Sequence, residues 1–464
     1  MYLGKLRDIA KIESKAAVND VVIAVPGWYT NIQRQAVLDA AEIAGLNALR
    51  LINDGTATAL GYGITKTDLP EVTEKPRYVA FVDIGHSDYS VTIAAYSKAQ
   101  LVIKAAAYDR HFGGRDLDYA LTQYFAEEFK GKYKIDVMSN PKAIFRLQTA
   151  VEKLKKVLSA NISAPINVES IMEDIDASSS LTREKLEELV APFLERAMTP
   201  LEKALKDSGL EKEDIDAVEL IGGTTRVPAL KNRISEFFGK PPSVTTNQDE
   251  AVARGATLAC ATLSPIFRVR EFSFTDIQQY PIDIVWDKVP EDEDTQLRLF
   301  EKNNGIPSTK MLTLQRKDAF ELEARYADPT ALPGGINPWV SRVMIKGVNP
   351  LPNGEAATVK VKCRVNPHGI FAFDGATLYE PVEEEEEAPA AATEEAGEAV
   401  EGQPAPAKKA KKTNKRELNF IAGSSALEKS LLEELREKEG NMHSTDRLVA
   451  ETEVRIVVLS ACML

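Results

Sequence analysis

Two buried-strand patterns that end in glycine carry the residues most able to do chemistry. The first runs from Val79 to Gly85 (VAFVDIG), and the second runs from Val218 to Pro228 (VELIGGTTRVP). Glycine lets the backbone approach a phosphate or a ribose closely, where any side chain would block it. One such turn is a weak signal, but two in one chain predict two sheets that face each other across a single nucleotide.

Polar residues near these turns are candidates for contact with phosphate and metal. Asp83 ends the first strand and suits a magnesium-bound water, because this hard cation prefers carboxylate and water oxygens. It could equally be an ordinary strand-end aspartate. Gly85 and His86 follow it and would face phosphate and metal. Asp249 precedes a small-residue helix, where helix capping is its favoured role and nucleotide contact the alternative. The second turn adds the candidates Gly222, Gly223, Thr224 and Arg226.

A helix expected over Pro141 to Ala160 presents a second set of polar candidates. One face of this helix is apolar, and the opposite face carries residues spaced i, i+3, i+4 and i+7. A carboxylate can accept hydrogen bonds from ribose hydroxyls, and lysine stems can lie flat on a base. Alone, such a face is typical of solvated charge, but the two glycine turns favour contact with an adenosine. The four residues are Glu152, Lys155, Lys156 and Ser159.

Hydrophobic periodicity divides the chain into two folded parts. The first alternates strand-like and helix-like patterns, as expected of an α/β domain. In the second, the period changes from 3.6 to 2, which predicts a β-sandwich of short antiparallel strands. Acidic and then basic residues with little to bury follow and are expected to be disordered. The expected boundaries are 1–262 for the α/β domain, 263–271 for a linker, 272–381 for the β-sandwich, 382–416 for the disordered linker, 417–453 for the start of a helical domain and 454–464 for an atypical apolar tail.

Composition limits the class of protein. The chain has 464 residues, 44% hydrophobic content and a formal net charge of −13, so it can bury more than one core. No window approaches the roughly 20 apolar residues of a membrane span, and the N-terminus lacks a signal-peptide pattern. We therefore expect no membrane partner and a cytoplasmic, or also nuclear, address. Three scattered cysteines and four histidines give no metal-ligand spacing, and the acidic balance argues against nucleic acid as a partner.

Six motifs occur in the order seen in the nucleotide-binding domain of the seventy-kilodalton heat-shock chaperones: LRLINDGTATALGYG, FVDIG, HFGGRDLD, EKLKKVLS, IGGTTRVP and DEAVARGA. The chain resembles this superfamily from about residue 8 to residue 453. DIGHSDYS, AVPGWYT and the acidic insert after the β-domain look like its divergent branch, the hundred-and-ten-kilodalton heat-shock family of the fungal type. The resemblance implies an actin-like (ribonuclease-H-like) ATPase domain that binds ATP or ADP with Mg²⁺.

Several residues depart from the pattern of the smaller chaperones. By the match, Asp54 takes the place of a glutamate that positions the attacking water, and the loss of one methylene retracts its carboxylate. A displacement of about 1 Å can cost on the order of a hundredfold in rate. Gly55 replaces a proline tied to signalling between domains, and Asp88 and Ser90 replace a threonine and a carboxylate near the γ-phosphate and magnesium. We therefore expect Asp54 and Asp83 to be weakened catalytic residues in a site that retains a nucleotide better than it hydrolyses one.

In the larger family, the ATP-bound state clamps a seventy-kilodalton partner and opens its cleft so that ADP leaves. The resemblance therefore implies a nucleotide-exchange factor and a holdase for unfolded polypeptides, with ATP as a mainly structural ligand. The linker favours this hypothesis, because Arg268 and Arg270 make its burial in a groove costly unless they are paired. An ATP-hydrolysing foldase is the alternative. A sugar-kinase-like enzyme on the same scaffold would not carry a β-sandwich.

The resemblance also implies truncation at both ends. The family's opening hairpin with an Asp-x-Gly phosphate loop, and a lysine near the γ-phosphate, find no match. We therefore expect half of the first lobe to be missing and hydrolysis to be weak or absent. At the other end, VRIVVLSACML interrupts a charged helix. A partial gene model, or an alternative product with an unread intron at its end, would explain both features. A true deletion isoform is the less favoured alternative, because removing strands exposes edges and core surface.

Overall fold

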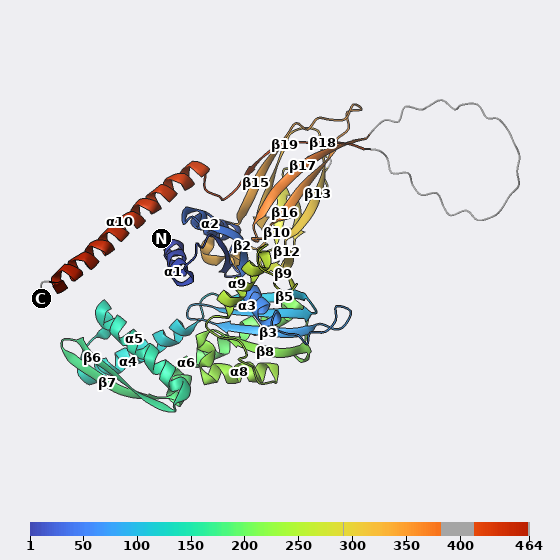
Figure 1. Cartoon of the computed structure of the whole chain (residues 1–464). Helices are drawn as coiled ribbons and strands as arrows, with labels where there is room; N and C mark the ends of the chain where they lie inside the picture. Colours follow the sequence, from blue (N-terminus) through green and yellow to red (C-terminus); the bar gives the residue numbers. More distant parts are fainter. Residues whose placement is uncertain (291, 382–412, 463–464) are drawn as a thin grey trace, which may run out of the picture.

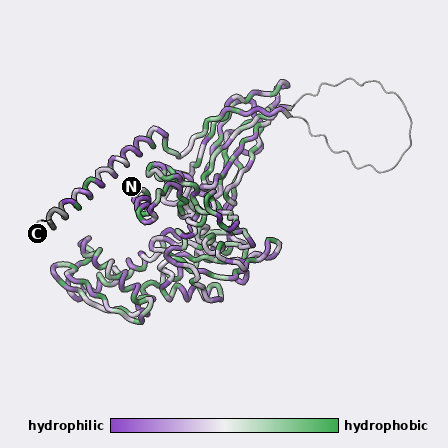
Figure 2. Tube along the Cα trace, in the orientation of Figure 1, coloured by the Kyte–Doolittle hydropathy of each residue, from purple (hydrophilic) through white to green (hydrophobic). Residues whose placement is uncertain are grey.

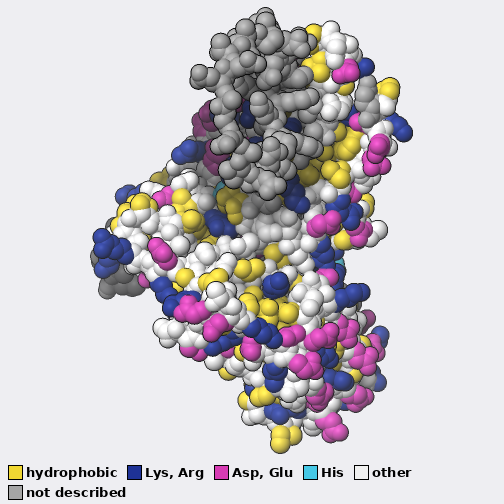
Figure 3. Space-filling model, turned by 90° about the vertical axis from the view of Figure 1, so that its right-hand side faces the viewer, with side chains coloured by type: hydrophobic (Ala, Val, Ile, Leu, Met, Phe, Trp, Pro, Cys, Tyr) yellow, Lys and Arg dark blue, Asp and Glu magenta, His cyan; other side chains and the backbone are white. Residues whose placement is uncertain are grey.

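The computed structural model describes residues 1–290, 292–381 and 413–462. Figure 1 shows an α/β part at the base, a group of strands that extends away from it, and helix α10 as a rod that passes near the N-terminus. On the face drawn in Figure 3, acidic and basic side chains intermingle, with hydrophobic side chains gathered between them near the middle.

A six-stranded mixed sheet forms the centre of the α/β part, in the order β12-β9-β5-β4-β3-β8. Strand β3 pairs antiparallel with β4 and parallel with β8. Alternate side chains of β3 enter different cores, because successive residues of a strand point to opposite faces: Val82 joins the helical core and Phe81 joins the core on the other face. The strands are β3 (Arg77–Ile84), β4 (Tyr89–Ser97), β5 (Gln100–Asp109), β8 (Ile215–Ile221), β9 (Ser273–Gln278) and β12 (Asn304–Ile306).

One face of this sheet is covered by helices and a small hairpin that share its larger core. Helix α5 buries Leu147, Val151, Leu154 and Leu158, as its apolar stripe predicts. These elements are α4 (Gly114–Tyr133), α5 (Pro141–Ala160), β6 (Ser163–Met172), β7 (Ile175–Thr182), α6 (Arg183–Arg196), α7 (Met198–Ser208) and α8 (Pro228–Phe238).

The opposite face carries helices α3 (Asp54–Gly63) and α9 (Ala251–Leu263), which cross closely. A Cβ atom on Gly255 would collide with the carbonyl oxygen of Ala57, so only glycine permits this approach. A second, two-stranded parallel sheet precedes α3 and is flanked by two further helices. Its parts are α1 (Tyr2–Ser14), β1 (Asp20–Val25), α2 (Asn31–Ile43) and β2 (Asn47–Asn53).

Two antiparallel sheets after the linker contribute to one hydrophobic core. Val359, Val361 and Cys363 are buried in it, while Lys360 and Lys362 between them face outward, so the alternation in the sequence follows the pleat. The five-stranded sheet has the order β11-β10-β14-β15-β19, and the four-stranded sheet has the order β13-β16-β17-β18. The strands are β10 (Ile282–Trp286), β11 (Gln296–Phe300), β13 (Ser308–Arg316), β14 (Phe320–Tyr326), β15 (Trp339–Lys346), β16 (Ala357–Val365), β17 (Phe371–Pro381), β18 (Thr413–Glu417) and β19 (Asn419–Gly423).

The start of the C-terminal region differs from the helix expected over 417–453. Residues 413–423 form β18 and β19, which pair with the edges β17 and β15, and Leu418 between them is buried in the common core. Backbone pairing with an open sheet edge outweighs the charged composition that suggested a solvated segment. The expected disorder over 382–412 lies outside the described residues.

Helix α10 begins later than expected, at Lys429, and continues to Cys462 through most of the residues assigned to the apolar tail. Figure 2 shows hydrophilic residues along much of its length, and most of its described side chains are exposed. In the described part of the chain, we find no helix with the length and apolar character needed to cross a membrane.

Candidate functional site

The two glycine turns lie side by side on one sheet, which corrects the expectation that they belong to two facing sheets. Strands β3 and β8 are parallel neighbours with Asp83 opposite Ile221, so both turns leave the same sheet edge. Thr224 donates a hydrogen bond from Oγ1 to the Gly85 carbonyl over 2.8 Å. Gly222 has a φ of +80°, and a Cβ atom there would collide with the Ile84 carbonyl. Glycine is therefore required at Gly222 by both conformation and packing.

A third glycine turn, the pair Gly113 and Gly114 at the start of α4, joins the other two. Gly114 donates from its backbone N–H to the Gly85 carbonyl over 3.0 Å, and Arg115 donates to the His86 carbonyl over 2.9 Å. A Cβ atom on Gly113 would collide with that same His86 carbonyl. In the sequence, this pair indicates a chain break and a family motif, and it was not predicted as part of the site. Two glycines directly before a helix N-terminus were the signal that could have found it.

Lys155 lies beneath the turns, although the sequence suggested an exposed platform for a base. Its ammonium group is buried, pairs with the Asp118 carboxylate at 2.8 Å and donates to the Gly114 carbonyl over 3.0 Å. Burial raises the pKa of Asp118, and the Lys155 ammonium opposes this rise. Asp118 was missed, because a buried partner four residues into a helix has no sequence signal of its own. Lys155 therefore anchors α5 to the start of α4.

The other three residues of the predicted α5 face lie nearer the surface. Glu152 and Lys156 are exposed and form an ion pair of 2.7 Å, and the hydrogen bond from Lys156 lowers the pKa of Glu152. Ser159 donates from Oγ to the Lys155 carbonyl over 3.0 Å. Two charged side chains thus stay accessible on α5, while contact of the three residues with adenosine remains a prediction.

Asp249 does not cap α9, which corrects the role favoured by the sequence. The helix begins at Ala251, and Asn247 Oδ1 accepts the backbone N–H groups of Asp249 and Glu250 over 2.9 and 3.2 Å. The Asp249 carboxylate instead pairs with the Arg226 guanidinium at 2.8 Å. This exposed pair brings the second glycine turn and the segment before α9 together.

Two carboxyl groups beside the turns have strongly perturbed acidity. Burial is the main cause that raises the pKa of Asp54 to about 7 and that of Asp83 to about 7. The Asp88 carboxylate raises the pKa of both Asp54 and Asp83 further. A 2.7 Å hydrogen bond from the Gly55 N–H to Asp54 Oδ1 lowers the pKa of Asp54. A nearby cation would favour the charged forms. Within the described residues, no three Asp, Glu, His or Cys side chains gather as direct metal ligands, and the sequence assigned Asp83 a contact through water.

Gly55 is required by packing across the site. A Cβ atom on it would collide with Thr92 Oγ1 on β4, so the proline found in the smaller chaperones has no room here. Two residues earlier, Asn53 makes two hydrogen bonds to the Asp276 carboxylate of β9. Its backbone N–H donates to Oδ2 over 3.0 Å, and its side-chain Nδ2 donates to Oδ1 over 2.8 Å. Asp276 was not foreseen, because its partner lies more than 200 residues away.

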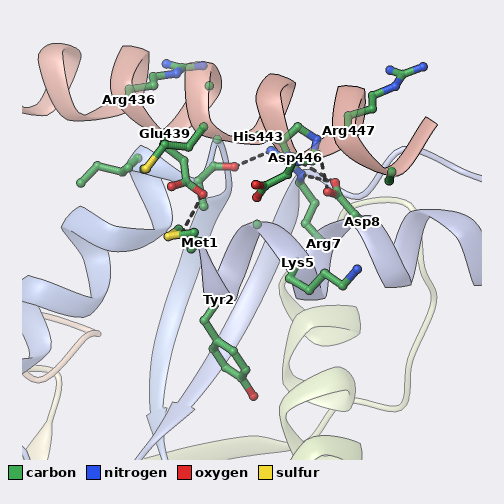
Figure 4. Close-up of a pocket in the computed structure, with 17 residues that line it drawn as sticks. Met1, Tyr2, Lys5, Arg7, Asp8, Arg436, Glu439, His443, Asp446 and Arg447 are labelled. Atoms are coloured by element: carbon green, nitrogen blue, oxygen red, sulfur yellow. Dashed lines mark hydrogen bonds and ion pairs between the residues drawn. The ribbon is translucent and has the colours of Figure 1, made fainter. Parts of the chain in front are cut away.

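A separate hollow lies away from the glycine turns, beside the N-terminus. A cavity of about 650 Å³ lies between α1 and α10, and Figure 4 shows Glu439 and His443 of α10 pointing toward residues of α1. Glu439 pairs with the Met1 amine at 2.7 Å, and His443 Nε2 lies 3.6 Å from Asp8 Oδ2. The cavity therefore separates two helices and is distinct from the predicted nucleotide contacts.

These features define an ATPase-type α/β fold with glycine turns gathered at one sheet edge. The sequence matches the family described as "Hsp70 protein" over residues 1–459, and the chain belongs to this family. Within it, the chain falls in the hundred-and-ten-kilodalton branch of the fungal type.

Three relatives illustrate this placement. The chain is 51% identical over 457 residues to a protein of Saccharomyces cerevisiae described as a heat shock protein homolog, covering 98% of this chain and 65% of the relative. It is 49% identical over 459 residues to "Heat shock protein hsp88" of Neurospora crassa, covering 98% and 64%. It is 47% identical over 387 residues to "Heat shock 70 kDa protein 4" of Rattus norvegicus, covering 83% and 46%. The chain thus spans just under two thirds of the length of the fungal relatives.

Proposed function

We propose that the chain binds ATP or ADP, with Mg²⁺, where its three glycine turns converge. The open backbone at Gly223 carries this proposal: a Cβ atom there would find its nearest neighbours, Arg226 Nη1 and Asp249 Oδ1, only at 3.8 Å. A ligand can therefore approach this main chain closely. Helix N-termini attract phosphate, and the start of α4 is held against the Gly85 turn. Mg²⁺ bound through water at Asp83 would neutralise phosphate charge.

We further infer that the whole protein is a chaperone of the hundred-and-ten-kilodalton type. In this function it is a nucleotide-exchange factor for a seventy-kilodalton heat-shock chaperone and a holdase for unfolded polypeptides, with ATP as a mainly structural ligand. The names of the relatives and the retracted carboxylate of Asp54 support this inference. Its proposed domains are 1–262 for nucleotide and 272–381, as a β-sandwich, for unfolded chains, in the cytoplasm and also the nucleus.

One observation favours the alternative of an ATP-hydrolysing foldase. The pKa of Asp54, raised to about 7, lies near the operating pH, where a general base works best. A foldase of this kind would hydrolyse ATP steadily and lose this activity on Asp54→Asn substitution. If the protein is instead an exchange factor, both the native chain and Asp54→Asn should hydrolyse little ATP.

The test is release of a fluorescent ADP from a purified seventy-kilodalton chaperone after addition of this chain with ATP. The native chain should accelerate release, and Gly223→Val should not, because its side chain fills the space proposed for the nucleotide. Gly375→Val is the matched control: its Cβ also meets open space, but in β17, far from the turns along the chain. Unchanged ATP affinity in Gly223→Val would remove the site assignment. Steady hydrolysis without acceleration of release would favour the foldase.

A further inference from the structure

Three side chains of the central sheet share one row that includes Asp83, a residue of the predicted nucleotide site. Asp83 of β3 is paired with Ser90 of β4, and Ser90 is paired with Tyr108 of β5. Directly opposite residues on neighbouring strands project to the same face. The preceding row, with Val82 and Val91, points into the helical core on the other face. Tyr108 therefore lies on the same face as the carboxylate predicted to hold magnesium.

Tyr108 reaches from this sheet to the loop that follows β1. A Cβ atom on Gly27 would collide with the Tyr108 hydroxyl group, so the phenol fills the space that the glycine leaves open. The Gly27 backbone N–H also lies close enough to the Asp54 carboxylate to lower its pKa. The Tyr108 hydroxyl thus lies beside the second candidate catalytic residue as well as in the row of the first.

The Tyr108 hydroxyl makes no hydrogen bond with any other described residue. Two other tyrosines contrast with it: Tyr96 donates to the Ala59 carbonyl over 2.7 Å, and Tyr280 donates to the Trp28 carbonyl over 2.9 Å. Burial, followed by the Asp54 and Asp276 carboxylates, raises the pKa of Tyr108 well above its ordinary value. The phenol is therefore protonated throughout the physiological range and remains a donor without an acceptor.

We propose that the Tyr108 hydroxyl donates a hydrogen bond to the terminal phosphate of a bound nucleoside triphosphate and thereby makes the site prefer ATP to ADP. This inference rests on the proposed nucleotide site. Asp54, Asp83 and Asp88 place three carboxyl groups on this side of the site, and Arg34 is a cation close enough to act on Tyr108. A phosphate oxygen beside these carboxyl groups needs hydrogen-bond donors. A protonated phenol supplies a donor, and the extra phosphate of ATP distinguishes it from ADP. Tyr108 is thus a positioning residue for nucleotide choice.

The experiment compares the dissociation constants of ATP and ADP by calorimetry, with Mg²⁺, for the native chain and Tyr108→Phe. Hydrogen bonds to charged groups are worth enough that Tyr108→Phe should weaken ATP binding by about tenfold or more, while ADP binding should stay unchanged. Tyr89→Phe is the matched control, because its hydroxyl is also without a partner among the described residues but faces the helical core. Its ratio of ATP to ADP affinity should equal that of the native chain.

A second measurement reports on Tyr108 without relying on affinity. In a chain labelled with ¹³C at tyrosine Cζ, the resonance lost in Tyr108→Phe should shift with a non-hydrolysable ATP analogue and not with ADP. Equal weakening of ATP and ADP in Tyr108→Phe would indicate a purely structural role and overturn the proposal, as would an unchanged affinity ratio. Failure of the native chain to bind either nucleotide would instead overturn the proposed nucleotide site and this inference with it.

Discussion

Asp54 and Asp83 are buried carboxyl groups, and burial disfavours their charged forms. Each has a folded-state pKa of about 7, compared with an ordinary value of 3.8. The folded protein therefore holds these protons more tightly than the unfolded chain does. The stability that these groups contribute is present below about pH 4 and is lost as the pH rises through 7.

We predict that Asp54→Asn makes the nucleotide-free protein more stable at pH 8 and reduces the fall in stability between pH 4 and pH 8. The amide cannot ionise, and its oxygen can still accept the hydrogen bond from the Gly55 N–H. Urea unfolding of both proteins at several pH values, without Mg²⁺, measures this difference. If Asp54→Asn and the native chain show the same pH dependence, ionisation of the buried Asp54 carboxyl does not lower the stability of the folded protein.

Residues with their own backbone signature could be predicted from the sequence, while residues defined by a distant partner could not. Gly85 and Gly222 directly follow the ends of β3 and β8, as the strand patterns ending in glycine predict. Asp118 and Asn247 take their roles from Lys155 and from the start of α9. The Asp249 carboxylate was assigned to capping because its pairing with Arg226 depends on tertiary distance.

At the scale of elements, α3 packs on β4 through a contact that leaves no room for a side chain at Gly55. Its Cβ atom would collide with Thr92 Oγ1 and lie 2.8 Å from Thr92 Cβ. We predict that Gly55→Ala lowers the free energy of unfolding by about 1–3 kcal/mol, as overpacking in a core does. Thr92 Oγ1 has no hydrogen-bond partner among the described residues, so removing it alone should cost little.

A double-mutant cycle measures this contact. Thr92→Ala removes the colliding oxygen, so Gly55→Ala combined with Thr92→Ala should recover part of the lost stability, with a coupling energy of about 0.5 kcal/mol or more. Chemical denaturation of the four proteins provides the values. Additive effects of the two substitutions would mean that α3 shifts away from β4 to relieve the collision.

The observed element boundaries agree with the expected ones where hydrophobic periodicity is strong. They differ where strand pairing determines the secondary structure. Helix α5 was expected over Pro141 to Ala160, and the structure has these bounds. Strands β18 and β19 were missed, because exposed edge strands carry few buried residues and a basic segment such as TNKRE has no apolar alternation. These residues form strands because they pair with the open edges of β17 and β15, and the tertiary fold sets the positions of those edges.

At the scale of the whole molecule, the loop from Gly27 to Asn31 connects the proposed nucleotide site with the strands beyond the linker. Tyr280 donates to the Trp28 carbonyl over 2.9 Å, and Asn31 donates from its backbone to the Tyr326 hydroxyl over 2.7 Å. In return, Asn31 Oδ1 accepts the Phe371 N–H over 2.7 Å. The two antiparallel sheets are therefore held against the small parallel sheet by specific hydrogen bonds.

His368 makes this contact dependent on pH. Its Nδ1 accepts the Leu51 N–H over 3.2 Å, so this nitrogen must be unprotonated in the docked state. Burial, followed by the charges of Arg50 and Arg34, lowers the pKa of His368 below its ordinary value of 6.5. Arg436 of α10 lines a cavity with His368 and is another cation near it. The folded protein therefore binds a proton at His368 less readily than the unfolded chain does.

We predict that contact between the two antiparallel sheets and the small parallel sheet weakens as the pH falls below 6.5. The stability contributed by a histidine with a lowered pKa is present above its unfolded value and is lost as the pH falls through the folded value. In His368→Asn, the amide oxygen can replace the acceptor without titrating, so the variant should lose this part of the acid sensitivity. Fluorescence energy transfer between dyes on α2 and β16, followed from pH 8 to pH 5, measures the contact. If the native chain and His368→Asn separate with the same pH midpoint, another group controls docking, and the hydrogen bond between Leu51 and His368 does not govern it.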